Sequence, residues 1–432
     1  MASLIKLIRK TYHMAGPQES NVVLSNVTLL SGLQLITYLL PIIIIPYLFR
    51  VLGPSKFGLI AFAQAFVQYF MIITDYGFSV TATKDISLCH TDKEKVREVF
   101  SSVMTVKILL TALSLGALSA LVYFVPKFRN DWLVYALSFG MVVGNTLFPT
   151  WFFQGMERMK YIANLNIVGE FIYAAAIFFF VKEWQDYLLV PLINSAVFLT
   201  VGILGQYIVW RRFGVVFKPQ NFSHIRKQLL HGWNVFISVV AINAYTNTRV
   251  FAVGLLTNNT MTGFYSIAEK IANVAQTFPL SAFSQAIFPR LSKIFHKNKV
   301  KAFLMMQQIQ HITIMVSVIC LPVIFIFSPF IVRVACGGDY PTTVMSLRLL
   351  LISVFLIASN AFRVQFLLVC GRTELYSMIH VTVALIGLPL IFLLIYSFSY
   401  VGAALATVFI EGGIFTITYF TVRGLSFSNK KA

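Results

Sequence analysis

The stretches ILLTALSLGALSALVYF (residues 108–124) and VTVALIGLPLIFLLIYSF (residues 381–398) contain no charged residue. Each approaches the roughly 20 apolar residues that a helix needs to cross a bilayer. Over the 432 residues, hydrophobic residues make up 58% and charged residues 11%, whereas soluble domains have about 25% charged residues. So few charges cannot form a water-soluble surface. The chain is therefore predicted to be an all-α polytopic membrane protein.

Twelve spans are found when a window of about 19 residues is moved along the chain. They are expected near 24–49, 57–80, 99–124, 132–154, 162–181, 187–210, 232–256, 262–288, 303–333, 342–369, 375–397 and 400–422. The loops on the side of the N-terminus hold 23 lysines and arginines, and the opposite loops hold six. The positive-inside rule then predicts that both termini are cytoplasmic.

The net charge of +19 is spread over these loops and does not form one basic patch, which argues against nucleic-acid binding. The four cysteines show neither CxxC pairing nor histidines at metal-ligand spacing. No metal and no cofactor is predicted.

An internal repeat is visible at about half the chain length. GLIAFAQ (58–64) resembles GFYSIAE (263–269), FFQGMERMKY before the fifth span resembles LVCGRTELYS before the eleventh, and spans six and twelve also match. We expect two six-helix lobes related by a parallel repeat, with an axis along the membrane normal. The predicted divisions are 1–210 (N-terminal lobe), 211–231 (cytoplasmic connector) and 232–432 (C-terminal lobe with a cytoplasmic tail).

Nine charged residues fall inside predicted spans. Each costs roughly 2.5–3.5 kcal/mol at the bilayer centre, so they must pair or face a water-filled interior. The cations, which are candidates for substrate binding, are Arg249, Arg348, Arg363, Lys107 and Lys270, and the acids, which are candidates for ion coupling, are Glu269, Glu411, Asp75 and Glu170. Pairing is possible for Glu411 with Arg363, and Asp75 could reach water.

The cations are concentrated in the second half of the chain. In an unbroken helix, Arg348 and Arg363 would be about 22 Å apart along the axis and about 60° apart around it. They would then form a ladder of positive groups through the membrane. Such a ladder suits an anionic ligand, and the planar fork of arginine suits phosphate oxygens.

Residues 38–87, YLLPIIIIPYLFRVLGPSKFGLIAFAQAFVQYFMIITDYGFSVTATKDIS, closely resemble the Wzx O-antigen flippases. These form the polysaccharide-transporter branch of the multidrug/oligosaccharidyl-lipid/polysaccharide (MOP) exporter superfamily. The resemblance includes the RVLGPSKFG turn, Gln64, Gln68 and TDYGF, and PTWFFQGMERM (149–159) is also typical. Related lipid II flippases carry a basic residue in the core of the first span. This chain has none there before Arg50, so their pattern of substrate contacts is not carried over.

The resemblance implies a MATE-like fold with a two-lobed cavity, in the bacterial inner membrane. It implies translocation of an undecaprenyl-diphosphate-linked oligosaccharide by alternating access, with possible coupling to H+ or Na+. A polysaccharide polymerase and a chain-length regulator are possible partners, beside membrane lipids. The resulting hypothesis is that Arg249, Arg348, Arg363 and Lys107 neutralise the diphosphate, while Glu269 or Glu411 titrates.

Two alternatives stay open. A small-molecule exporter of the MATE type is expected to have a cavity dominated by carboxylates, and here buried cations are in excess. A membrane-embedded glycan transferase or polymerase needs a sizeable external loop with catalytic acids or histidine. The predicted external loops are short and contain no histidine, so a transporter without enzymatic activity is favoured.

Overall fold

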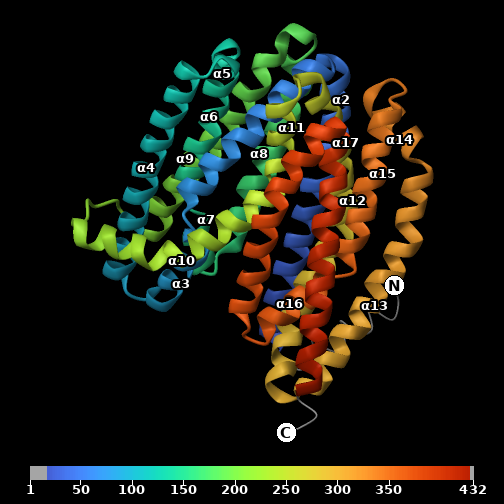
Figure 1. Ribbon diagram of the computed structural model, residues 1–432. Helices are drawn as coiled ribbons and strands as arrows, with labels where there is room; N and C mark the ends of the chain where they lie inside the picture. The colour runs from blue at the N-terminus through green and yellow to red at the C-terminus, as the bar shows by residue number, and fades with distance from the viewer. Residues whose placement is uncertain (1–16, 429–432) are drawn as a thin grey trace.

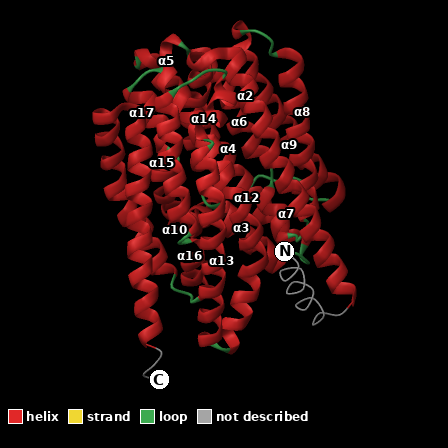
Figure 2. Ribbon diagram, turned by 90° about the vertical axis from the view of Figure 1, so that its right-hand side faces the viewer, coloured by secondary structure: helices red, strands yellow, loops and turns green. Residues whose placement is uncertain are grey.

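The computed structural model describes residues 17–428, with side chains from Leu40 onward except at some positions of three helices, including 278–290. Every regular element in this part of the chain is helical, as Figure 2 shows. The prediction of an all-α protein is confirmed.

Sixteen α-helices and one short 3-10 helix follow one another along the chain. They are α2 (Pro17–Asp75), α3 (Phe78–Cys89), α4 (Lys93–Phe124), α5 (Pro126–Asn130), α6 (Trp132–Leu147), α7 (Thr150–Gly155), α8 (Met159–Phe180), η1 (Trp184–Leu188), α9 (Leu189–Phe213), α10 (Phe222–Thr246), α11 (Thr248–Leu256), α12 (Asn259–Lys297), α13 (Lys299–Ile326), α14 (Ser328–Cys336), α15 (Pro341–Ala358), α16 (Ala361–Val369) and α17 (Thr373–Ser428).

The helices of the two halves of the chain form two lobes. In Figure 1, α4, α6 and α9 lie on one side, α13, α15 and α17 lie on the other, and α2 runs between them. The C-terminus lies at one end of this bundle, and α5 lies at the opposite end. We call these the C-terminal end and the α5 end.

Eight helical segments of the described part are long and apolar enough to cross a membrane, or nine when the bent pair α10 and α11 counts as one. Two of the long helices, α2 and α17, contain non-helical residues, at Gly53 in α2 and at Phe398 and Ser399 in α17. Gly53 has a φ of 73°, which glycine adopts without steric strain. Both breaks fall in predicted external loops. The structure is thus a multi-pass membrane protein consistent with twelve spans, although the total of twelve stays a prediction.

The two halves of the chain touch where the repeat places equivalent glycines. A Cβ atom on Gly58 would lie 2.5 Å from the backbone nitrogen of Gly263 and 1.7 Å from the carbonyl oxygen of Asn259. A Cβ on Gly263 would lie 2.1 Å from the carbonyl oxygen of Pro54. Two repeat-related residues that face each other are what a two-fold axis between α2 and α12 requires.

This contact gives a first prediction. Gly58→Ala should force α2 and α12 apart and lower the Tm of the purified protein, because overpacking costs about 1–3 kcal/mol. Gly116→Ala is the matched control, since a Cβ there meets no atom within 4 Å. An equal Tm for the two variants would contradict the close contact. The comparison is a thermal melt in one detergent.

The predicted connector is partly helical. α9 ends at Phe213, and α10 begins at Phe222, about ten residues before the predicted start of the second lobe. The first turns of α10 pack against the break between α2 and α3. Tyr76 Oη donates to the carbonyl of Leu229 at 3.2 Å, and the Tyr76 ring stacks on Phe236 at 4.6 Å. This hydrogen bond and this ring contact hold α10 against the end of α2. The lobe boundaries themselves stay a prediction.

Candidate functional site

A cavity of about 400 Å³ lies inside the bundle. Its walls come mainly from α2, α6, α8 and α9 of the first half, and Lys270 of α12 in the second half also lines it. Its apolar residues include Pro41, Phe57 and Val190. The cavity therefore belongs mainly to the first half, and the second half contributes Lys270 to its lining.

The polar lining of this central cavity is dominated by carboxamides. Five amide side chains line it, and they come from four helices: Gln64, Gln68, Asn145, Asn166 and Asn194. Each amide offers two N–H donors and one carbonyl acceptor. Amides can therefore hydrogen-bond hydroxyl groups in either direction, and they carry no charge that would attract ions.

Two charged residues complete the lining, Lys270 and Glu170. Neither forms an ion pair with any charged side chain that the structure describes. Lys270 is thus the predicted substrate-binding cation that the structure places in the central cavity. Glu170 is the predicted ion-coupling acid that it places there.

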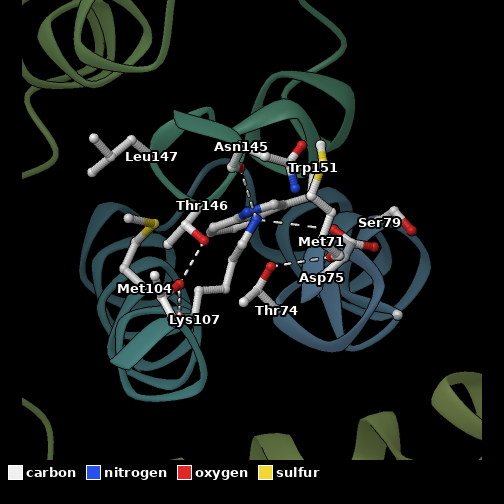
Figure 3. A network of polar contacts seen from close by, with 12 residues as sticks. Met71, Thr74, Asp75, Ser79, Met104, Lys107, Asn145, Thr146, Leu147 and Trp151 are labelled. Carbon is white, nitrogen blue, oxygen red and sulfur yellow. Dashed lines mark hydrogen bonds and ion pairs between the residues drawn. The ribbon is translucent and has the colours of Figure 1, made fainter. Parts of the chain in front are cut away.

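Lys107 lies outside this lining, in a buried network shown in Figure 3. Its side chain is 1% exposed, and its Nζ lies 3.9 Å from Asp75 Oδ1. It also donates to the carbonyl of Asn145 at 3.3 Å. Next to it, the hydroxyls of Thr111 and Thr146 lie 2.8 Å apart. Asp75 thus pairs with a cation of α4, which holds the end of α2 against α4 and α6.

Arg249 is also paired. Its Nε lies 3.4 Å from Glu269 Oε1, and the two side chains are 15% and 13% exposed. Its Nη1 donates to Thr407 Oγ1 at 3.1 Å, and its Nε donates to the carbonyl of Thr246 at 3.2 Å. Glu411 is near enough to interact with Arg249 electrostatically. This cluster joins α11, α12 and α17, so Arg249 holds three helices of the second half together.

Arg348 and Arg363 lie in one candidate span, Pro341–Val369, and the ladder expected from the sequence stays a prediction. That expectation assumed one unbroken helix, but the helix is interrupted between α15 and α16 at Ser359 and Asn360. Arg348 donates from Nε to Ser328 Oγ at 3.0 Å and lies over the Phe325 ring at 4.9 Å. Arg363 is not paired with Glu411 in the described part of the chain. Neither arginine lines the central cavity.

An aromatic cluster closes the bundle on the α5 side of the central cavity. The Phe62 ring stacks with Phe128 at 5.9 Å and with Phe251 of the second half at 5.3 Å. Lys127 of α5 donates to the carbonyls of Gly254 and Leu255 at the end of α11, the latter at 2.9 Å. A cation at the C-terminus of a helix is stabilising because it opposes the helix dipole. These contacts join the two halves at the α5 end.

Lys127→Ala should weaken this closure. The loss of a helix-terminal cation costs about 0.3–1 kcal/mol, so the open population should rise by about two- to fivefold. The measurement is the rate at which a maleimide labels Phe251→Cys, in a chain whose four native cysteines are replaced by serine. Lys182→Ala is the control, because Lys182 is on a loop at the same end. Equal rates in both backgrounds would show that Lys127 does not hold the halves closed.

Sequence reasoning did not single out most of the amides. Gln64 and Gln68 belong to the family resemblance of the second span, whereas Asn145, Asn166 and Asn194 were not singled out. A useful signal exists, because all five are polar residues inside apolar spans. That all five line one cavity depends on how four helices are arranged, and the sequence pattern does not show this arrangement.

Comparison with known proteins places the chain in a protein family. A family model described as "Polysaccharide biosynthesis protein" matches residues 23–295. A protein of Escherichia coli (strain K12) named "Putative O-antigen transporter" is 30% identical over 88% of this chain and 92% of its own length. A protein of Shigella dysenteriae with the same name is 24% identical over 89% and 96%, respectively.

Solved structures share the fold. An inward-facing multidrug resistance MATE family transporter of the MOP superfamily matches with a TM-score of 0.73 and 12% identity, over 90% of this chain and 95% of its own. The lipid II flippase MurJ, in an inward closed conformation, matches with a TM-score of 0.69 and 13% identity, over 93% and 87%. The expected MATE-like fold is confirmed, and the chain belongs to the polysaccharide biosynthesis protein family.

Proposed function

We propose that this protein is a flippase that moves undecaprenyl-diphosphate-linked oligosaccharide repeat units across the bacterial inner membrane by alternating access. The central cavity carries the proposal, because it combines five amides with a cation, Lys270, beside one carboxylate, Glu170. Lys270 is near enough to Glu269 to interact with it electrostatically, but it forms no ion pair with a described acid. The names of the curated relatives, which refer to O-antigen transport, point to the same substrate class. The fold shared with a lipid II flippase is consistent with it.

The two chemistries of the cavity match the two parts of such a substrate. Sugar hydroxyls both donate and accept hydrogen bonds, so the amides would bind the oligosaccharide. A diphosphate requires cationic donors, and Lys270 would supply one. Arg249 and Lys107 would act indirectly, since each already holds a carboxylate, and Arg348 and Arg363 do not line this cavity.

Ion coupling would use the carboxylate in the cavity. Glu170 lines the cavity and forms no ion pair with the described charged residues, so H+ or Na+ could reach it with the substrate. Glu269, Glu411 and Asp75 are less suited, because each interacts with a buried cation. Both termini would be cytoplasmic, and the polymerase and chain-length regulator would receive the unit on the far side.

The proposal can be tested in a set of bacteria that make different repeat units and whose own O-antigen flippase genes are deleted. Expression of the chain should restore surface glycan, which is measured as the ladder of lipopolysaccharide bands. Asn166→Leu together with Gln68→Leu should reduce the ladder without reducing the amount of protein. Absence of glycan with every repeat unit tested, despite normal protein levels, would contradict the proposal.

A further inference from the structure

A second cavity, of about 350 Å³, lies near the C-terminal end of the bundle, between α13, α16 and α17. Its polar lining consists of two arginines, one histidine, two glutamines and one tyrosine: Arg363, Arg423, His311, Gln307, Gln310 and Tyr419. No acidic residue of the described chain lines it. It shares no lining residue with the central cavity. Its charge therefore favours an anion, at a place separate from the central cavity.

Arg363 is held in a geometry that suits anion binding. Its guanidinium carbon lies 4.9 Å from the centre of the Phe415 ring and 5.1 Å from that of Tyr419. Both rings belong to α17, and these cation–π contacts hold the Arg363 side chain against that helix. Its Nη1 is buried and has no hydrogen-bond partner in the described part of the protein. Because Nη1 is covered by protein atoms, the other N–H groups of Arg363 would make the contacts with an anion in the cavity.

The helix break beside Arg363 is fixed by two hydrogen bonds. Gln310 Nε2 donates to the carbonyl of Ala358 at 2.9 Å, and Thr418 Oγ1 donates to Asn360 Oδ1 at 2.5 Å. Gln310, Asn360 and Thr418 are all buried. α16 begins directly after the break, so Arg363 occupies its first turn. The Arg363 side chain is therefore attached to a rigid helix end, which favours preorganised binding.

We propose that this second cavity binds the phosphate of a lipid head group. It lies between membrane-spanning helices close to their ends, which is where head groups are, and basic pockets of this kind bind phospholipid phosphates. Arg363 would donate hydrogen bonds to the phosphate oxygens, and Arg423 would add a second positive charge. The ligand is either an anionic phospholipid or the diphosphate of a carrier lipid. The proposal does not depend on the transport function proposed above.

The test is native mass spectrometry of the full-length protein, purified in detergent and titrated separately with cardiolipin, phosphatidylglycerol and undecaprenyl diphosphate. Arg363→Gln should weaken binding of at least one probe about tenfold or more, because it removes charge-assisted hydrogen bonds. Arg423→Gln should weaken the same probe. Arg348→Gln should leave binding unchanged, since Arg348 also lies over a phenylalanine ring, at 4.9 Å, but lines neither cavity.

The probes separate the two sources of phosphate. An effect confined to undecaprenyl diphosphate assigns the cavity to the carrier lipid, and an effect on cardiolipin or phosphatidylglycerol assigns it to the membrane. The Tm of each variant shows whether it is folded. If Arg363→Gln is unstable, the lipid binding of Arg423→Gln decides, because Arg423 is exposed. Binding that is unchanged by Arg423→Gln and by a folded Arg363→Gln, or weakened equally by Arg348→Gln, would overturn the proposal.

Discussion

Lys270→Gln should reduce translocation of a diphosphate-linked oligosaccharide by about 10- to 100-fold, while the protein stays folded. The reason is that Lys270 lines the central cavity and forms no ion pair with the described acids. A hydrogen bond to a charged group contributes about 1.5–3 kcal/mol, and each 1.4 kcal/mol is about tenfold. The loss of Lys270 therefore removes attraction for the diphosphate and leaves no carboxylate unpaired.

Conservative replacement provides the control for this prediction. Lys270→Arg keeps the positive charge and should keep at least partial transport, measured as surface glycan at matched protein levels. If Lys270→Gln and Lys270→Arg fail equally and both melt at the native Tm, the shape of lysine matters and its charge does not. If Lys270→Gln transports normally, the cavity cation does not bind the diphosphate.

Arg249→Leu, unlike Lys270→Gln, should mainly reduce the amount of folded protein. Arg249 and Glu269 are both mostly buried and lie 3.4 Å apart. Removal of one partner from such a pair costs about 3–5 kcal/mol, because the other charge is left without compensation. This is a large part of the total stability of about 5–15 kcal/mol that is typical of proteins. We expect a much lower yield of monodisperse protein and a lower Tm.

A second substitution should recover much of this loss. Glu269→Gln in the Arg249→Leu background removes the uncompensated charge, so the double variant should be more stable than Arg249→Leu alone. The measurement is the Tm of the three proteins in the same detergent. A double variant that is less stable than the single one, with losses that simply add, would show that the two residues do not stabilise each other.

The membrane fold could be predicted from the sequence because a spanning helix requires about 20 apolar residues, and blocks such as 108–124 are hard to interpret otherwise. The repeat was visible for a similar reason, since Gly58 and Gly263 lie at a close contact that excludes larger residues. The break at Ser359 and Asn360 was not predicted. No proline or glycine marks it, and the apolar pattern continues through it.

The charged residues of the site were easy to find because a charge stands out in an apolar span. Their partners were hard to predict, because each ion pair joins two different helices. Lys107 of α4 pairs with Asp75 of α2, and Arg249 of α11 pairs with Glu269 of α12. The amides of the cavity were less conspicuous, since uncharged polar residues are common in membrane helices. Only the arrangement of the helices separates Lys270, in the cavity, from cations that hold the bundle together.

The most direct test of the flippase proposal is a transport assay in proteoliposomes that contain only the purified protein and a fluorescent undecaprenyl-diphosphate-linked oligosaccharide. A membrane-impermeant quencher added outside reports how much label has changed leaflet. The account predicts leaflet exchange that is fast with the native protein and about 10- to 100-fold slower with Lys270→Gln. Exchange no faster than in protein-free liposomes, from a preparation with the native Tm, would contradict it.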